Sequence, residues 1–393
     1  MLSRLSTAGL RDLNLAGKKV LPIVQGGMGV GVSAHRLAGS VAREGAVGTV
    51  ASVDLRHHHP DLLEQSHRQP KEYIDNLNLI ALDREINAAR ELSGGNGLIA
   101  VNVMKAVKEH GQLVRQACAS GADAIVMGAG LPLDLPEMTA SHPKVALIPI
   151  LSDARGIALL LKKWMRKGRL PDAIVIEHPR YAGGHLGAAR MEDVNDTRFD
   201  FPLVLEQTHA LFRELQLAPD QVPLICAGDI NSHQQVLELQ RQGAAAVQLG
   251  TAFAVAEESD AALEFKRVLA EAKAEDVVEF MSVAGLPARG VLTPWLKNYL
   301  KREALLQSKA KCDPNRCAAG LHCLSLCGLR DGMAKFGQFC IDSQLAAAMR
   351  GDLAKGLFFR GAGRLPFGSA IRPVRELIAY MLTGARPVGL AGA

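Results

Sequence analysis

The chain has few aromatic residues and no long hydrophobic run. Phe, Trp and Tyr make up 4% of its 393 residues, so the core must be built mainly from Ala, Val, Leu and Ile. No stretch of about eighteen consecutive apolar residues occurs, which excludes an ordinary membrane-spanning helix. Dense blocks of Lys and Arg are also absent and the net charge of +5 is spread thinly. Neither nucleic acid nor a membrane is therefore expected as a partner.

The remaining composition is that of a globular α/β protein with an appended segment. Apolar residues make up 48%, charged residues 22%, and there are 38 glycines. Seven cysteines are present, and five of them lie between Cys312 and Cys340. Such clustering favours a local cysteine site in a reducing cytoplasm over a secreted disulfide framework. Cys118 and Cys226 stand in apolar surroundings and are expected to be small core residues.

Eight short apolar runs predict a (β/α)8 TIM barrel. A helical crossover fits between successive runs, and the runs do not alternate polar with apolar, as expected for parallel strands covered on both faces. A doubly wound open sheet is the alternative. The runs are 20–24, 46–51, 98–104, 124–127, 145–151, 173–177, 223–227 and 245–249.

Three regions follow from this pattern. Residues 1–18 are interpreted as an N-terminal extension and residues 19–274 as the barrel. The segment 275–393 does not continue the repeat and contains the cysteine cluster, a Gly/Arg-rich stretch at 359–368 and a helical pattern at 374–382. We interpret it as a helical cap or lid on the barrel.

The barrel fold predicts the active site at the carboxyl ends of the strands, where glycines recur. The most informative end is Gly183-Gly184-His185, which follows the sixth run and places a titratable side chain beside two residues without Cβ. A tight turn with a surface histidine is the alternative. The other ends are Gln25-Gly26-Gly27-Met28, Asn102, Ala227-Gly228 and Gly250-Thr251.

The last two strand ends suit a phosphate. In TIM barrels the loops after strands seven and eight are the usual phosphate site, and here each contains glycine and precedes a helix. Gly26 to Gly31 does not form a G-x-G-x-x-G fingerprint, so a Rossmann interpretation is weak.

Together these motifs resemble the nitronate monooxygenase family of FMN-dependent TIM barrels, which is related to flavin-dependent enoyl-ACP reductases and some quinone reductases. The matching stretches come in family order and are 22–29, 102–104, 128–132, 182–187, 227–230 and 247–253. The resemblance implies that Gly27 and Met28 line the flavin and that Asn102 hydrogen-bonds it. It further implies that the Gly228, Gly250 and Thr251 amides hold the phosphate and that His185 faces the reacting carbon.

The expected function is FMN-dependent oxidation of alkyl nitronates with O2. The alternative within enzymes is reduction of FMN by NAD(P)H, followed by reduction of an enoyl thioester or a quinone. A flavin-free binding barrel organised by a metal is the alternative from another class. The sequence leaves the substrate, the nicotinamide and the formation of a homo-oligomer open.

Two further groups could bind metal. The cysteine spacing Cys312-x4-Cys317-x5-Cys323-x3-Cys327-x12-Cys340 lacks a C-x2-C pair. We expect a zinc or iron–sulfur site on Cys317, Cys323, Cys327 and Cys340, with Cys312 as the alternative ligand. A set of reduced thiols without metal is the other interpretation. Adjacent histidines at 57–59, with His67, are expected to be solvent-exposed rather than metal-bound.

Overall fold

Eight parallel strands close into a barrel in the computed structural model, which describes residues 9–313, 316–317 and 324–389. Each strand pairs with the next one along the chain, and β11 pairs with β3 to close the ring, so the predicted TIM barrel is confirmed. The strands are β3 (Ile23–Gln25), β4 (Val47–Ala51), β5 (Leu98–Met104), β6 (Ala124–Gly128), β7 (Ala146–Leu151), β8 (Ile174–Glu177), β10 (Leu224–Ala227) and β11 (Ala246–Leu249).

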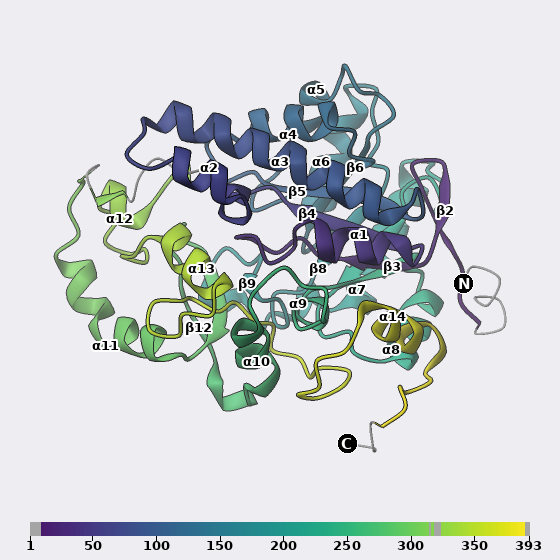
Figure 1. Cartoon of the computed structure of the whole chain (residues 1–393). Coiled ribbons are helices and arrows are strands. Elements are labelled where there is room, and N and C mark those ends of the chain that lie inside the picture. Colours follow the sequence, from purple (N-terminus) through teal and green to yellow (C-terminus); the bar gives the residue numbers. More distant parts are fainter. Residues whose placement is uncertain (1–8, 314–315, 318–323, 390–393) are drawn as a thin grey trace.

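Helices cover the outside of the barrel (Figure 1). The longest, α3, ends at Gly94, whose left-handed backbone (φ 60°) terminates the helix. The α-helices of this ring and its loops are α1 (His35–Arg43), α2 (Pro60–Gln65), α3 (Lys71–Ser93), α4 (His110–Ala119), α5 (Leu135–Met138), α6 (Ala154–Met165), α7 (Phe201–Glu214), α8 (His233–Arg241), α9 (Thr251–Ala254) and α10 (Leu263–Glu271). Short 3-10 turns are η2 (Leu55–His58), η3 (Met191–Asp193) and η4 (Thr197–Phe199).

The inside of the barrel is a separate apolar core with polar side chains above it. Alternate residues, for example Ala173 just before β8 and Val175 within it, point inward and are fully buried. The same alternation aims the next inward residue, Glu177, at the carboxyl end of the barrel. Asn102 of β5 lies at the same end of its strand, so polar groups reach this end from the barrel interior.

An N-terminal hairpin closes the opposite end. Its strands β1 (Leu13–Leu15) and β2 (Lys18–Val20) pair antiparallel, and Leu13, Leu15 and Val20 pack into the inner barrel core. The bottom of the barrel is therefore sealed, and access is left at the carboxyl ends of the strands.

The C-terminal segment wraps the carboxyl end and then returns to the side of the barrel. A short 3-10 turn η5 (Ala274–Asp276) leads into a three-stranded sheet of β12 (Val277–Met281), β13 (Pro287–Val291) and β9 (Gly184–His185), which joins the segment to the barrel loops. Its helices are α11 (Pro294–Ser308), α12 (Gly328–Asp331), α13 (Ile341–Met349) and α14 (Val374–Thr383).

The last helix, α14, packs against α1 and α8 of the barrel ring rather than over the cavity (Figure 1). Its apolar side chains Leu377, Ile378 and Met381 are buried in the main core shared with those helices. His233 of α8 also bonds the Met381 carbonyl through Nδ1, at 3.0 Å.

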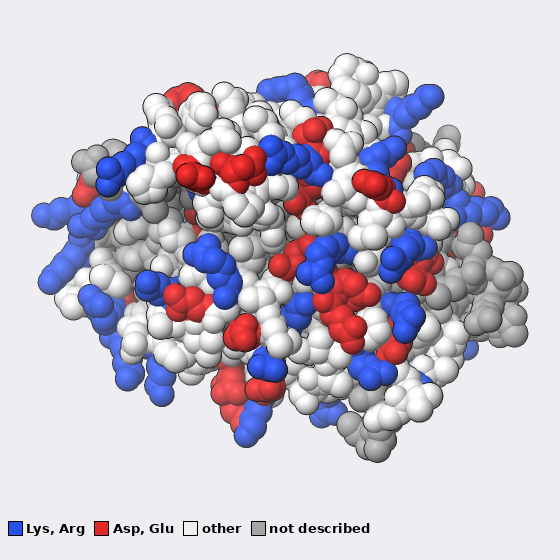
Figure 2. Space-filling model, in the orientation of Figure 1, with Lys and Arg blue, Asp and Glu red and all other residues white. Residues whose placement is uncertain are grey.

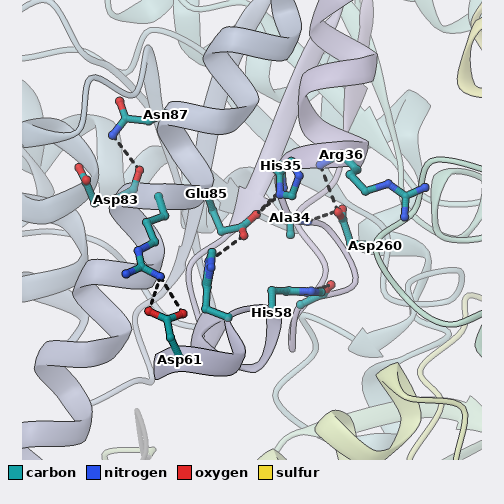
Figure 3. A network of polar contacts seen from close by, with 12 residues as sticks. Ala34, His35, Arg36, His58, Asp61, Asp83, Glu85, Asn87 and Asp260 are labelled. Atoms are coloured by element: carbon teal, nitrogen blue, oxygen red, sulfur yellow. Dashed lines mark hydrogen bonds and ion pairs between the residues drawn. The ribbon is translucent and has the colours of Figure 1, made fainter. Parts of the chain in front are cut away.

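The histidine run at 57–59 is a correction to the sequence analysis. These side chains were expected in solvent, yet all three are half-buried, and only His67 is exposed. His58 bonds the Gly31 carbonyl through Nε2 at 2.8 Å, and His59 Nε2 lies 3.0 Å from Glu85. Figure 3 shows Glu85 reaching toward His35, whose Nδ1 is 2.7 Å from that carboxylate. The run was misjudged because its partners come from distant parts of the chain.

The prediction that Cys118 and Cys226 are core residues is confirmed. Cys118 and Cys226 are buried, and burial raises the pKa of the Cys118 thiol to about 11. Trp164 is fully buried and donates its indole N–H to the Pro132 carbonyl at 3.2 Å. Within the described residues, no helix has both the length and the apolar character needed to span a membrane.

Candidate active site

A cavity of about 680 Å³ lies at the carboxyl ends of the barrel strands. One wall is formed by strand ends and the loops that follow them, and the other by the C-terminal segment. Apolar side chains such as Leu286, Leu345 and Phe359 come from that second wall. A cavity of this size, mostly apolar and with a few polar groups, is the usual form of a small-molecule site.

His185 projects into this cavity from β9. The loop before it is fixed by Arg289 of β13, which is buried and donates to the Pro179 carbonyl at 3.2 Å and the Ala182 carbonyl at 2.6 Å. Glu279 of β12 forms an ion pair with the same guanidinium. The C-terminal segment thus determines where the barrel loop presents its histidine.

The second ring nitrogen of His185 is held by a buried serine. Nε2 lies 3.0 Å from the Ser282 hydroxyl, which itself accepts from the Ala284 N–H at 3.2 Å. The Ser282 hydroxyl can also donate one hydrogen bond, and when it donates to Nε2 the imidazole proton lies on Nδ1. Burial lowers the pKa of His185 to about 4, so the ring is neutral at pH 7 and offers an N–H donor.

Glu177 is a second titratable group in the cavity, and the sequence analysis missed it. It is the last residue of β8, and burial raises the pKa of its carboxyl to about 7. Its side chain lines the cavity, so part of its surface is accessible there although protein surrounds it on every other side. An acidic residue ending a barrel strand was the signal that could have identified it.

Gly250 leaves room for a ligand, whereas Gly27 leaves room for a neighbouring side chain. A Cβ added to Gly250 would meet no atom within 4 Å, so the cavity is open at that point. A Cβ on Gly27 would collide with the side chain of Asn102, so glycine is required for the first strand end to approach the third.

The glycine pair before His185 approaches protein rather than empty space. A Cβ on Gly183 would lie 2.6 Å from the backbone of Arg360, and one on Gly184 would contact Phe359 at 3.4 Å. Gly184 also has a φ of 73°, which favours glycine. Both residues line the cavity, but close packing on the C-terminal segment accounts for their lack of side chains.

Most of the remaining predicted cofactor residues line the cavity, but Gln25 does not. Gly26, Met28, Asn102, Ala227, Gly228 and Thr251 line the cavity. Gln25 is fully buried and its side chain instead accepts from the Thr49 N–H at 2.8 Å, joining β3 to β4. The sequence could not distinguish a buried glutamine from one that faces the cavity.

Arginines from the C-terminal segment flank the end of strand β10. Arg364 is exposed and lines the cavity, and its backbone N–H bonds Asp229, the residue after Gly228. Arg360 is buried and gives its guanidinium to the carbonyls of Leu269 and Gly361, at 2.9 Å and 2.7 Å. Arg364 is therefore one of the cations that line the cavity and its backbone lies beside the end of β10, which the Gly/Arg-rich stretch did not reveal by itself.

Three of the predicted metal cysteines, Cys317, Cys327 and Cys340, line the same cavity. Cys340 accepts from the Ser343 hydroxyl at 3.3 Å and precedes α13. Cys323 lies outside the described residues. Cys312, the alternative ligand, is exposed and does not line the cavity.

The residues present fit a flavin mononucleotide. Open space at Gly250, with Thr251 and Arg364 in the cavity lining, provides an anion-compatible corner, and the glycines at Gly27 and Gly228 add backbone surface for a flat ring.

Comparison with known proteins agrees with this arrangement. A family model described as "Nitronate monooxygenase" matches residues 14–384. A "Probable nitronate monooxygenase" of Bacillus subtilis (strain 168) is 29% identical over 289 residues, covering 70% of this chain and 78% of the relative. Another from Staphylococcus saprophyticus is 25% identical over 287 residues, covering 69% and 75%.

Two solved structures share the fold. FabK from Thermotoga maritima has a TM-score of 0.63 at 20% identity and covers 97% of this chain and 95% of its own. Nitroalkane oxidase from Streptomyces ansochromogenes has a TM-score of 0.62 at 18% identity, with coverage of 92% and 94%. At such identities the likeness concerns the fold alone.

Proposed function

The chain belongs to the nitronate monooxygenase family and is an FMN-dependent oxidoreductase; we propose that its substrate is an alkyl nitronate and its oxidant O2. The observation that carries this proposal is the neutral His185, which presents an N–H donor to a largely apolar cavity. A nitronate is a small anion with negative charge on its oxygens. A buried donor in a weakly solvated site favours such an anion over a neutral molecule of the same shape.

The cofactor is proposed to lie along the barrel wall. Its phosphate would meet the amides of Gly228, Gly250 and Thr251, with Arg364 as the counter-charge. Gly27, Met28 and Asn102 would hold the ring system at the other end of the cavity. When bound, FMN supplies the electron-accepting chemistry and the reaction with O2.

His185 orients and stabilises the substrate. Its Nδ1–H would donate to a nitronate oxygen while Ser282 holds Nε2. Bringing an anion next to the ring raises the pKa of the imidazole from its low resting value, because opposite charge favours the protonated form. To take a proton from a neutral nitroalkane, the ring would instead carry its proton on Nε2, donated to the Ser282 hydroxyl, and offer Nδ1 as the base.

A stopped-flow comparison tests the substrate. The purified flavoprotein is mixed without oxygen with propionate 3-nitronate, NADH or NADPH, and the flavin absorbance is followed. Nitronate oxidation predicts rapid bleaching with the nitronate and slow bleaching with both nicotinamides. Rapid bleaching with either nicotinamide and none with the nitronate would contradict the proposal.

A second function, reduction of an enoyl thioester, is favoured by the basic charge on α11 and the residues just after it. The stretch 294–312 has five exposed bases against one acidic residue, Glu303, and Lys and Arg side chains gather over α11 in Figure 2. Such a basic surface suits an acidic carrier protein that delivers an apolar acyl chain. This alternative requires NAD(P)H as the reductant, which the same stopped-flow comparison detects. The basic side chains are Lys297, Lys301, Arg302, Lys309 and Lys311.

The cysteine segment is proposed to hold zinc or an iron–sulfur cluster on Cys317, Cys323, Cys327 and Cys340. Support comes from the three described members, which line one cavity although up to 23 positions separate them in the sequence. Thiolates are the ligands that both centres prefer. Elemental analysis of protein purified without oxygen decides the matter: less than about a tenth of an equivalent of iron and of zinc removes the site.

A further inference from the structure

A second group of metal-ligand side chains lies behind the cavity wall, apart from the cysteines. Asp54, His57 and Asp342 each offer one ligand atom, and these atoms lie within 4.8 Å of one another. Asp54 and His57 belong to the turn after β4, whereas Asp342 lies in the first turn of α13. Almost 290 positions of sequence separate the two sides, so the fold itself brings these ligands together.

Asp54 is buried, His57 and Asp342 are half-buried, and all three have polar atoms without a hydrogen-bond partner. Asp54 is fully buried, and the side chain of His57 is 11% exposed. Neither ring nitrogen of His57 has a hydrogen-bond partner, and the same holds for Oδ1 of Asp342. His57 Nε2 approaches Asp54 Oδ2 only to 3.5 Å. Buried carboxylates and imidazoles without partners are costly, so a missing partner is expected between them.

The neighbouring histidines have closer polar contacts. His58 bonds the Gly31 carbonyl, and His59 Nε2 lies 3.0 Å from Glu85 but without hydrogen-bond geometry; Figure 3 shows His58 directed away from Glu85. Of this histidine run, His57 is the member with both ring nitrogens buried and without a hydrogen-bond partner.

The nearby cations do not balance the negative charge of the two carboxylates in this group. Arg56 forms an ion pair with Asp54, and its guanidinium is also shared with Ser66 and Asn78. Arg350, the other cation that acts on Asp342, is exposed at the end of α13. The carboxylates of Asp54 and Asp342 therefore face one closely bound cation.

We propose that Asp54, His57 and Asp342 bind a divalent first-row transition metal ion. One imidazole nitrogen with carboxylate oxygens suits Mn²⁺, Fe²⁺ or Zn²⁺, whereas Mg²⁺ and Ca²⁺ prefer oxygen ligands alone. Asp54 would bind through the oxygen turned toward His57 and keep its ion pair with Arg56 on the other. Solvent or a further side chain completes the coordination.

The ion would fasten the C-terminal segment to the barrel. Ser52 and Val53, just before the first ligand, line the cavity, and so do Cys340 and Asp342 itself. A metal bridging η2 and α13 would fix the distance between the two cavity walls. This role is structural and does not depend on which substrate the enzyme oxidises.

Mn²⁺ is the sharpest probe, because thiolates prefer softer ions and the cysteine segment competes weakly for it. Full-length flavoprotein is treated with a chelator, desalted and titrated with Mn²⁺, and free Mn²⁺ is measured by electron paramagnetic resonance. We expect about one equivalent to be taken up by the wild type, with binding at least about tenfold weaker in Asp342→Asn and His57→Ala. His67→Ala and Asp61→Asn remove an exposed imidazole and an exposed carboxylate, and should bind Mn²⁺ as the wild type does.

A measurement on the wild type needs no variant. Saturating Mn²⁺ should raise the melting temperature of the chelator-treated protein, because a ligand that binds only the folded chain stabilises it. Absence of saturable uptake, an unchanged melting temperature, or full uptake by both Asp342→Asn and His57→Ala would overturn the proposal. Loss of nitronate activity with normal Mn²⁺ uptake would count against the proposed function alone.

Discussion

The barrel edge and the C-terminal segment face each other across one cavity and contribute different chemistry to it. The barrel edge supplies open space at Gly250 and a close approach of two strand ends at Gly27. The C-terminal segment supplies side chains: Ser282 holds His185, Arg289 fixes the loop before it, and Arg364 brings positive charge. His185 belongs to the barrel in sequence but pairs with β13 of the segment.

This difference indicates a division of tasks. Barrel positions determine whether the cofactor fits, because a side chain added there occupies its space. Positions in the segment determine how well the reacting group is oriented, because they act through hydrogen bonds to it. Changes on the two walls should therefore separate cofactor retention from rate.

The largest difference between the effect on rate and the effect on cofactor retention is expected at His185. His185→Ala should retain FMN but turn over about 10²- to 10⁴-fold more slowly, the usual contribution of a proton-handling or oxyanion-stabilising group. Flavin content is read from absorbance and the rate from anaerobic flavin reduction by the nitronate. His67→Ala, an exposed histidine, is the control. A decrease of less than about threefold would reduce His185 to a turn residue.

Gly250→Leu should instead weaken the retention of FMN. Its side chain enters the open space that the phosphate is proposed to occupy, so FMN affinity should fall by at least about a hundredfold, or about 2.7 kcal/mol. Gly111→Leu on α4 places the same side chain against only the side chain of Arg115 and serves as control. Full flavin occupancy in the cavity variant would disprove the phosphate placement.

The raised pKa of Glu177 should make the free energy of unfolding depend on pH. Its pKa is raised to about 7 in the fold from 4.5, so the unfolded chain loses its proton first and stability falls as pH rises from about 4.5 to 7. In FMN-free protein, Glu177→Gln should be more stable than the wild type above pH 7, by up to about 3 kcal/mol, and indistinguishable from it below pH 4. Urea unfolding at several pH values measures this. The exposed Glu214→Gln should give no such crossover.

The smallest effect is expected at Ser282. Ser282→Ala removes the bond to Nε2 and should lower kcat by about three- to tenfold, since one hydrogen bond contributes about 1 kcal/mol. FMN content should not change, and KM should change less than kcat. Ser308→Ala on α11 is the control. Loss of FMN in the Ser282 variant would mean that the two walls are not separable as described.

The barrel could be predicted from the sequence because each strand is a short apolar run with a helix after it. Periodicity of this kind is local, so the run at 173–177 and the glycine at 250 were recognised in their correct places. The C-terminal segment lacks such a repeat. Its contacts, such as Ser282 with His185 or Arg360 with Gly183, join residues far apart in sequence and leave no local pattern.

Chemical role was harder to predict than position. The sequence identified Gln25 as a strand-end residue but could not show that its side chain turns to Thr49. Glu177 was not predicted because the glycine-flanked histidine eight positions later is the stronger local signal. His57 was assigned to solvent because its burial depends on α13, which no pattern near residue 57 reveals.

The position of α14 between α1 and α8 has a consequence for synthesis. The last barrel strand ends at Leu249, and α14 begins 125 residues later, at Val374. At about 5–20 residues per second, a ribosome needs roughly 6–25 s to cover that interval. For that time the apolar faces of α1 and α8 that α14 will cover are without their partner, and the nascent barrel depends on chaperones or on transient contacts to stay out of aggregates.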